Sequence, residues 1–353
     1  MRTTMAVVAV ALGAGVVAAG EARACSAEDW QDCAGKPWVV GETMDTPIGE
    51  AWWPHPLWGE GDQAGSTNWY TRPEVVNRSV AEADAGVVYR LGRDYDASMP
   101  LFGDRVFALR TQGSPTGGPF GANYVIWHDE FLATEIGQVG TQFDGLAHIG
   151  VQVGPTTDTS EMVFYNGFTE ADIGGAYGMR ALGTEHLHPI VARGVLLDIA
   201  GARGVARMEA GDEITMADVE AALARQGMAD FAFMPGDAVA FHTGWGQLWG
   251  EDNATFNSGE PGIGAEVAKW LSDEVQAGVV GADTWAVEAV PNPDPACVFC
   301  VHQHLIARHG ILLQENMDLD GLIADEVWTY LYTYSPVPIA GATGSIGAPV
   351  AVD

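Results

Sequence analysis

Short apolar runs rich in β-branched and aromatic residues recur along the chain, and each is followed by a turn or by polar residues. This pattern is typical of buried or half-buried β-strands. The stretches between the later runs instead repeat apolar residues at helical spacing. The strand-like runs span residues 87–89, 106–109, 124–127, 194–198, 238–242 and 279–281.

Three helices are predicted between these strands. Thr215 and Asp218 have the spacing of a capping box, and apolar residues follow on one helix face. A second amphipathic pattern covers residues 267–275. A third helix is expected to begin near His302 and to stop at Gly310, because glycine commonly ends helices.

The order of these elements predicts the domain organisation. Strands alternate with helices over residues 190–320, which indicates an α/β fold. No stretch after residue 60 is long or polar enough to be a linker, so residues 61–353 are expected to form a single domain. Residues 25–60 are rich in Trp and Pro and are expected to form an irregular N-terminal arm.

The first 24 residues have the pattern of a secretory signal peptide. Arg2 precedes an unbroken small and apolar run over residues 5–19, and residues 22–24 (Ala-Arg-Ala) fit a cleavage site. The run is too short to span a bilayer comfortably. An uncleaved anchor is one alternative. A lipoprotein attached through Cys25 is another, but Arg23 departs from the small residues usual there. The pattern therefore predicts an exported, periplasmic protein.

The charge of the chain excludes two classes of partner. Asp and Glu number 47 against 16 Lys and Arg, which gives a formal net charge of −31. An acidic surface of this size repels phosphate backbones and anionic headgroups. We therefore expect no nucleic acid and no membrane surface as a partner.

Four cysteines follow the predicted signal peptide, and in an oxidising compartment an even number favours disulfides. Three connectivities are open, and local pairing of Cys25 with Cys33 and of Cys297 with Cys300 is our first expectation. Two histidines follow Cys300 closely, so a zinc site or a redox pair is the alternative there. Export disfavours zinc, because oxidised cysteines cannot bind a metal.

The densest group of candidate catalytic side chains lies in residues 138–148, which read Gln-Val-Gly-Thr-Gln-Phe-Asp-Gly-Leu-Ala-His. Small residues surround Asp144 and His148, so the backbone can approach a ligand closely. An Asp four residues before a His is an arrangement that metal and acid–base sites use. A structural hydrogen bond would explain the pair equally well.

This segment resembles the signature of the cyclase-like metal-dependent hydrolases, the family of bacterial kynurenine formamidase and isatin hydrolase. The family pattern is His-x-Gly-Thr-His-x-Asp-x-Pro-x-His. Three of its positions are replaced, because Gln138 and Gln142 stand for histidines and Leu146 for the proline. The positions that are kept are Gly140, Thr141, Asp144 and His148.

Further segments are similar to the family in the same order, so the resemblance covers about residues 55–350. It implies an α/β fold with a mixed sheet flanked by helices and with β-hairpin extensions, assembled as a homodimer or homotetramer. The further matching segments are residues 58–68, 194–198, 242–245, 281–284, 302–315 and 341–345.

The resemblance also implies a metal site. Gln303 is reached by counting back twelve residues from Glu315, so three ligand histidines would be glutamines while both carboxylates are kept. Such a concerted change suggests a working variant site of oxygen donors, which suit Mn, Mg or Ca better than Zn, or which hold no metal. Alternatively, His302 or His304 substitutes as a ligand after a one-residue shift. The implied ligands are Gln138, Gln142, Asp144, Gln303 and Glu315.

His148 and Asp144 match the catalytic residues of the family. A histidine, whose unperturbed pKa is about 6.5, can transfer protons at neutral pH. We expect an arylformamidase-like hydrolase of non-peptide carbon–nitrogen bonds. Its small-molecule substrate would be an amide, formamide, cyclic amide or lactone, with a cation polarising the carbonyl group and His148 accepting a proton from water. The alternatives are a metal-independent lyase or lactone hydrolase, and an exported binding protein without catalysis.

Overall fold

The computed structural model describes residues 53–152, 158–295 and 297–353. The expected signal peptide and most of the expected arm, with Cys25 and Cys33, lie outside these residues. Within the described part of the chain, no helix combines the length and the apolar character needed to cross a membrane.

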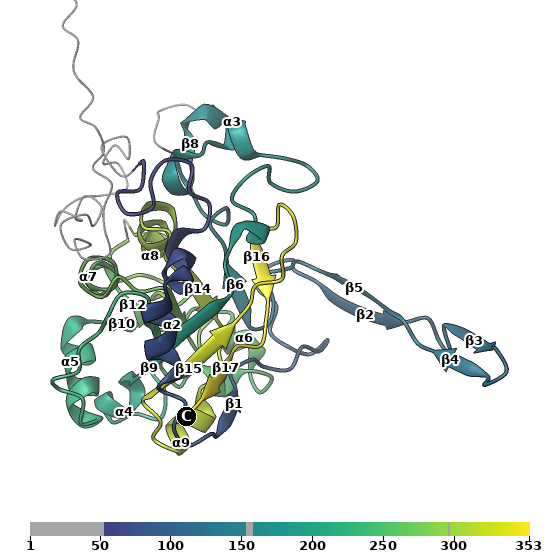
Figure 1. Ribbon diagram of the computed structural model, residues 1–353. Coiled ribbons are helices and arrows are strands. Elements are labelled where there is room, and N and C mark those ends of the chain that lie inside the picture. Colours follow the sequence, from purple (N-terminus) through teal and green to yellow (C-terminus); the bar gives the residue numbers. More distant parts are fainter. Residues whose placement is uncertain (1–52, 153–157, 296) are drawn as a thin grey trace, which may run out of the picture.

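A nine-stranded mixed sheet forms the centre of the protein (Figure 1). Its strand order is β1-β17-β15-β9-β11-β13-β14-β6-β16. The four central strands β9, β11, β13 and β14 are parallel, and the outer pairs are antiparallel. The strands are β1 (Val88–Arg90), β17 (Val350–Val352), β15 (Thr329–Tyr334), β9 (Ile190–Asp198), β11 (Ala238–His242), β13 (Val279–Ala282), β14 (Leu312–Glu315), β6 (Gln142–Asp144) and β16 (Gly344–Ile346).

Side chains of the central strands alternate between two hydrophobic cores, one on each face of the sheet. In β11, Ala240 belongs to the first core, whereas Val239 and Phe241 belong to the second. Leu312 and Leu313 of β14 divide in the same way. Because both faces are buried, these strands are mainly apolar in sequence. This confirms the predicted α/β fold.

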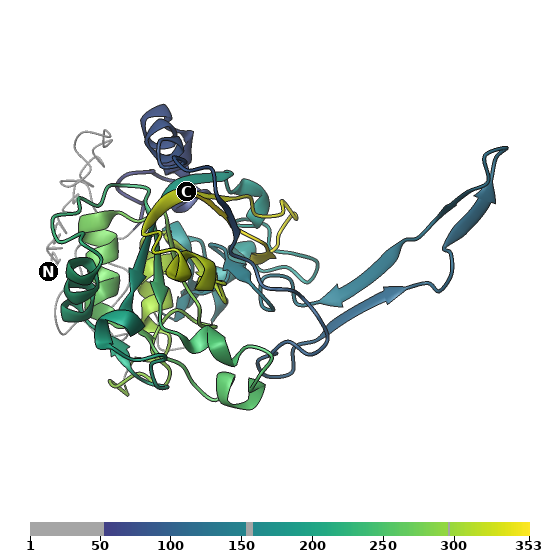
Figure 2. The same ribbon diagram turned by 90° about the horizontal axis from the view of Figure 1, so that it is seen from below.

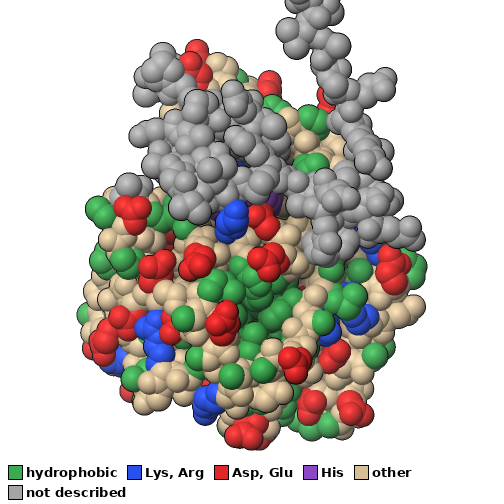
Figure 3. All heavy atoms as spheres, turned by 90° about the vertical axis from the view of Figure 1, so that its left-hand side faces the viewer, with side chains coloured by type: hydrophobic (Ala, Val, Ile, Leu, Met, Phe, Trp, Pro, Cys, Tyr) green, Lys and Arg blue, Asp and Glu red, His purple; other side chains and the backbone are tan. Residues whose placement is uncertain are grey.

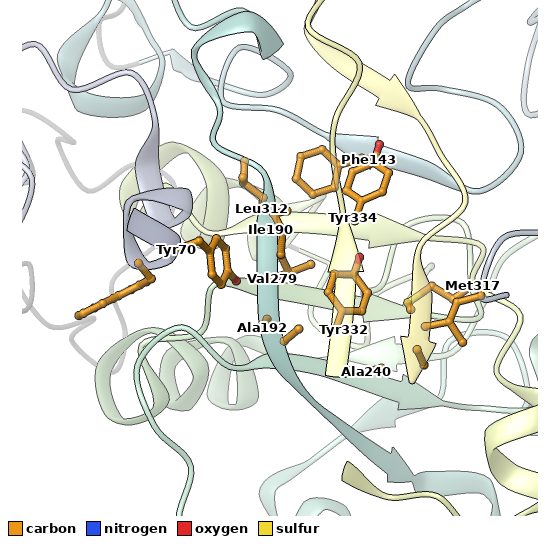
Figure 4. Packing of buried hydrophobic residues seen from close by; sticks show 14 of the residues in the cluster. Tyr70, Phe143, Ile190, Ala192, Ala240, Val279, Leu312, Met317, Tyr332 and Tyr334 are labelled. Carbon is orange, nitrogen blue, oxygen red and sulfur yellow. The ribbon is translucent and has the colours of Figure 1, made fainter. Parts of the chain in front are cut away.

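The first core contains several aromatic side chains (Figure 4). Phe143 of β6 and Tyr334 of β15 lie with their ring centroids 5.0 Å apart. Helix α2 (Pro73–Val80) covers this core and contributes the buried Val75. The second core is covered by α4 (Ile199–Arg203), α5 (Met216–Arg225), α7 (Ala265–Trp270) and α8 (Cys300–His302).

The three predicted helices are confirmed, with one difference. The capping box is present, because the Thr215 hydroxyl accepts from the Asp218 amide and the Asp218 carboxylate accepts from the Thr215 amide. However, α7 continues into a π-helical turn, Leu271–Val275, and α8 continues into another, Gln303–Arg308. Gly310, with φ of +61°, follows the second turn. A π-helical turn accommodates an extra residue, and this changes the spacing of residues at the candidate site.

A long β-hairpin projects from the body of the protein, here called the hairpin arm (Figures 1 and 2). Its inner part pairs β2 (Phe107–Thr111) with β5 (Glu130–Thr134), and its tip pairs β3 (Gly117–Phe120) with β4 (Val125–Trp127). The arm confirms the β-hairpin extension implied by the family resemblance.

Shorter elements complete the chain. The two-residue strands are β7 (Val151–Gln152), β8 (Met162–Val163), β10 (Glu213–Ile214) and β12 (Gly262–Ile263). The remaining α-helices are α3 (Glu170–Ile173), α6 (Asn253–Phe256) and α9 (Asp320–Ala324). The 3₁₀ turns are Gly65–Thr71, Thr159–Glu161, Tyr165–Gly167, Thr184–His186 and Trp245–Leu248. On the face seen in Figure 3, acidic side chains surround a central group of apolar ones, in agreement with the net charge of −31.

Candidate active site

The candidate catalytic side chains meet where β6 and β14 lie side by side. Gln142 of β6 pairs with Glu315 of β14, and Asp144 lies two residues further along β6. Alternate residues of a strand face the same side, so all three side chains face the layer that contains α8. His148 follows in the turn after β6, and His302 ends α8.

Gln142, His148, His302 and Glu315 form one end of a cavity of about 170 Å³, and Asp144 is buried beside them. Its other walls are mainly aromatic, and the Phe102 and Trp285 rings stack with their centroids 4.6 Å apart. The Arg105 guanidinium lies 5.5 Å from the centroid of the Phe102 ring. An apolar slot with a few convergent polar groups is typical of small-molecule sites. The lining residues are Phe102, Arg105, Gln138, Gln142, His148, Ile149, Trp285, Ala286, Phe299, His302 and Glu315.

His302 lies at the centre of the polar end and is buried. Its Nδ1 atom is 2.6 Å from Oε1 of Glu288, and its Nε2 atom is 3.3 Å from Oε1 of Glu315 and 3.5 Å from Oδ2 of Asp144. An ionised carboxylate only accepts hydrogen bonds, so Nδ1 carries the proton that faces Glu288. The Nε2 atom is thereby directed at the other two carboxylates.

The structure does not bring Gln303 to the cluster. The Gln303 side chain donates to the Gly150 carbonyl oxygen at 3.0 Å, and His304 contacts the Ser272 hydroxyl at 2.9 Å. His302 lies beside Glu315 instead, because the π-helical turn adds a residue between them. The one-residue shift therefore describes the geometry, because His302 and not Gln303 lies beside Glu315 and Asp144.

The two remaining glutamines direct amide nitrogen toward the carboxylates. The Oε1 atom of Gln138 accepts from Arg105 at 2.8 Å, and its Nε2 atom lies 3.2 Å from Oδ1 of Asp144. The Gln142 amide donates to Oε2 of Glu315. This orientation does not fit the expectation that Gln138 and Gln142 bind a metal through their oxygens. In this geometry they hold the carboxylates by hydrogen bonds.

The buried charges shift the pKa values of several groups. Burial, with the charge of Asp144, raises the pKa of Glu315 to about 8. Burial alone would lower the pKa of His302, but its hydrogen bonds to carboxylates raise the pKa well above the usual value. Burial would likewise raise the pKa of Asp144, yet His148 and His302 outweigh it and lower the pKa. For His148, burial is the main cause of a lowered pKa.

The donor set fits a divalent cation. Oδ2 of Asp144 is buried and has no hydrogen-bond partner in the described part of the chain. Ligand atoms of Asp144, His148 and His302 lie within 4.8 Å of one another, and Glu315 adds a further oxygen. Metal-binding histidines commonly donate their other ring N–H to a carboxylate, as His302 does to Glu288. Because this set includes an imidazole nitrogen, the all-oxygen argument for Mn, Mg or Ca over Zn no longer holds.

Two residues of the site were not found from the sequence. Glu288 orients His302, and Arg105 orients Gln138. The signal for Glu288 is an acidic residue inside the apolar run Trp-Ala-Val-Glu-Ala-Val, a position at which a charge is rarely buried unless it is paired. No local signal distinguishes Arg105, because it reaches the site from the base of the hairpin arm.

A disulfide joins Cys297 and Cys300, which confirms the expected local pairing at these positions. The two cysteines enclose Phe299, which has φ of +52° and lines the cavity. The Phe299 ring packs edge-on against His302, with centroids 5.5 Å apart. The disulfide loop is thus part of the aromatic wall of the site.

Comparison with known proteins agrees with the fold. Residues 89–289 match the model of a family described as putative cyclase. A crystal structure described as a novel cyclase superposes with a TM-score of 0.71 at 28% identity, covering 84% of this chain and 96% of the other. Isatin hydrolase A from Labrenzia aggregata, bound to benzyl benzoate, gives a TM-score of 0.51 at 17% identity, covering 78% and 98%. An isatin hydrolase bound to the product analogue thioisatinate gives 0.51 at 16% identity, covering 75% and 91%. Among curated proteins, none matches the chain.

Proposed function

Because this chain belongs to the cyclase family, we propose that it hydrolyses a carbon–nitrogen bond, or the equivalent lactone ester bond, in a small aromatic molecule. One observation carries the proposal. Glu315 and two histidines line the polar end of an aromatic-walled cavity, and the buried Asp144 carboxylate lies against both histidine rings. The cleaved bond would lie at this end, and a planar ring would lie between the aromatic walls.

The named activity of the fold neighbours supports a reaction of this class. Two of them are described as isatin hydrolases, and one holds a product analogue. Within the reaction class, we propose a formamide, cyclic amide or lactone, because a cavity of about 170 Å³ suits a small planar molecule.

Asp144, His302 and Glu315 would hold a divalent cation, which when bound supplies polarisation of the carbonyl group and a lower pKa for a water molecule. The chain's own groups then divide the remaining work. The carboxylate of Asp144 accepts a proton from water and returns it to the leaving group, and His148 at the cavity wall faces the substrate atom that gains negative charge. Glu288 holds the His302 ring in place.

A metal-independent hydrolase is the second candidate, and the position of His302 favours it. Hydrogen bonds to the surrounding carboxyl groups hold the pKa of His302 well above its usual value, which favours an imidazolium beside Asp144. In that state the ring itself occupies the place of a cation. Hydrogen bonds from the ring and from the glutamine amides would then stabilise the negative charge that develops on the substrate oxygen.

Metal analysis of the purified protein, combined with a hydrolysis panel, tests both candidates. The panel contains an aryl formamide, a cyclic aryl amide, an aryl lactone and a simple aryl ester, each assayed with and without a chelator. Hydrolysis that a chelator abolishes and Zn²⁺ or Mn²⁺ restores supports the first candidate. Hydrolysis that withstands the chelator supports the second. Binding without turnover of any substrate would contradict both.

A further inference from the structure

We infer that Arg105 and Gln138 are positioning residues that fix the ring tautomer of His148, so that neutral His148 donates a hydrogen bond from Nε2. The catalytic meaning of this inference rests on the proposed function, but the tautomer itself can be measured without any substrate. Three successive contacts link Arg105 to the His148 ring, and in each of them the donor and the acceptor can be identified.

The first step concerns Arg105. Its guanidinium donates to Oε1 of Gln138 at 2.8 Å and lies over the Phe102 ring. The backbone is anchored at the next residue, where the Val106 amide donates to Glu135 at 2.7 Å. A guanidinium has only donors and stays charged at any ordinary pH. The group that faces it must therefore be an acceptor.

The second step fixes the Gln138 amide. With its oxygen toward Arg105, its nitrogen faces acceptors: the Gly137 carbonyl oxygen at 2.6 Å and Oδ1 of Asp144 at 3.2 Å. The flipped amide would place NH₂ against the guanidinium and an oxygen against two other oxygens. Each of these contacts would leave a polar group unsatisfied, which is costly in a buried site. Only one orientation satisfies all three neighbours.

The third step assigns the proton on His148. Its Nδ1 atom lies 3.1 Å from Nε2 of Gln138. An amide NH₂ group cannot accept, so a protonated Nδ1 would face another donor, whereas an unprotonated Nδ1 shares the two N–H groups with Gly137 and Asp144. In the neutral ring the proton is then on Nε2, which lies 3.7 Å from Oδ2 of Asp144.

This assignment divides the roles at the site. A neutral ring with its proton on Nε2 cannot accept a proton there, so the expectation that His148 takes a proton from water does not fit this tautomer. The ionised carboxylate of Asp144 is the acceptor. His148 is the donor, directed at the oxygen or nitrogen that gains negative charge as the substrate is cleaved.

The tautomer can be read by ¹⁵N NMR of the full chain with ¹⁵N-labelled histidine, because protonated and unprotonated ring nitrogens have widely separated shifts. The His148 signals are assigned by their absence in His148→Gln. Spectra are recorded at mildly alkaline pH after chelator treatment and again with Zn²⁺. We expect unprotonated Nδ1 and protonated Nε2 in the native protein. Arg105→Met and Gln138→Leu should show a mixture of tautomers.

Arg105→Lys keeps a cationic donor and should restore the native tautomer in part. Arg110→Met, on an exposed position of the same arm, is the matched control and should leave the His148 signals unchanged. Circular dichroism and thermal unfolding verify that each variant is folded. Where a substrate is found, Arg105→Met should lower kcat more than it raises KM.

Two results would overturn the inference: predominant protonation of Nδ1 in the native protein, or an unchanged tautomer in a folded Gln138→Leu variant. The native tautomer without hydrolysis of any substrate would contradict the proposed function while leaving the positioning roles of Arg105 and Gln138 intact. The two failures are therefore distinguishable.

Discussion

Oε1 of Glu288 lies 2.6 Å from Nδ1 of His302 and also accepts from the backbone amide of that residue at 3.0 Å. Both contacts come from a buried carboxylate, so the position and the protonation of the ring are set together. The other ring nitrogen, Nε2, faces Asp144 and Glu315. Glu288 is thus expected to control how well His302 binds a cation.

The variant Glu288→Gln keeps an oxygen for the ring N–H but removes the negative charge that makes His302 a better ligand. Loss of such an outer partner typically lowers metal affinity about 10–100-fold. Competition with a chromophoric chelator measures the affinity for Zn²⁺ and Mn²⁺. Glu251→Gln, at an exposed position, is the control. Equal affinities of Glu288→Gln and the native protein would contradict this role.

Neighbouring substitutions test which side chain of α8 and its π-helical turn is the ligand. His302→Gln should abolish specific metal binding, because it removes the imidazole beside Asp144 and Glu315. Gln303→Leu should leave metal binding unchanged, since that side chain is turned toward the Gly150 carbonyl oxygen, to which it donates at 3.0 Å. Titration calorimetry with Zn²⁺ distinguishes the two. If Gln303→Leu lost metal binding and His302→Gln kept it, Gln303 would be the ligand, as the spacing from Glu315 predicts.

For His148→Gln we expect a folded protein that has lost hydrolysis by roughly 10²–10⁴-fold, the usual contribution of a positioned acid or base. The residue lies at the cavity wall and is not fully buried, so the free energy of unfolding should change little. Turnover on a substrate from the panel and a urea denaturation curve check the two parts. His186→Gln, at an exposed position, is the control. Unchanged turnover would move proton transfer to another group.

The elements of the fold were predictable because their signals are local. The run at residues 238–241 is apolar throughout, and the structure buries it in β11 between two cores. The capping box at Thr215 needs only two side chains three residues apart and begins α5 as predicted. Such patterns are read within one element, so no knowledge of the rest of the chain is required.

The site was only partly predictable, because its contacts join elements that are distant in sequence. Asp144 and Glu315 follow from the family signature, and the structure places both in the cluster. The choice between His302 and Gln303 depends on a π-helical turn, which has no reliable local pattern. The orientation of Gln138 depends on Arg105, which approaches from the hairpin arm. Neither effect can be read from the spacing of residues.

The disulfide loop is expected to support the aromatic wall rather than the whole fold. A bond between Cys297 and Cys300 closes a very short loop, and the chain-entropy relation gives a stabilisation of only about 2 kcal/mol for that length. The same loop encloses Phe299, whose positive φ is unfavourable for residues other than glycine.

We therefore expect the double variant Cys297→Ser, Cys300→Ser to unfold at slightly lower urea concentration but to bind aromatic ligands clearly more weakly. Quenching of tryptophan fluorescence by the aromatic compounds of the hydrolysis panel measures this affinity. The native protein with a reducing agent should behave like the double variant, and the double variant should not respond to the reductant. Equal ligand affinity with and without the disulfide would show that Phe299 is held by its other contacts.

The capping box of α5 should make stability depend on pH in the acid range. Burial would raise the pKa of Asp218, but hydrogen bonds from Arg203 and Thr215 outweigh it and lower the pKa to about 2. Both carboxylate oxygens accept from the Arg203 guanidinium at 2.8 Å. The pKa of Asp218 is lower in the folded protein than in the unfolded chain, where it is roughly 3.9. Ionised Asp218 therefore stabilises the fold fully when the pH is above that unfolded-state pKa. This stabilisation is lost as the pH falls through about 2.

The variant Asp218→Asn should accordingly be less stable than the native protein at neutral pH, by about 1 kcal/mol for the lost cap together with its ion pair. The difference between the two should shrink as the pH is lowered from about 4 toward 2, because the native side chain becomes neutral as well. Urea denaturation followed by circular dichroism at several pH values measures it. Asp230→Asn, at an exposed position beyond the end of the same helix, should give a small difference without this trend. A difference for Asp218→Asn that stays constant down to the lowest pH would mean that the charge of this carboxylate does not stabilise α5.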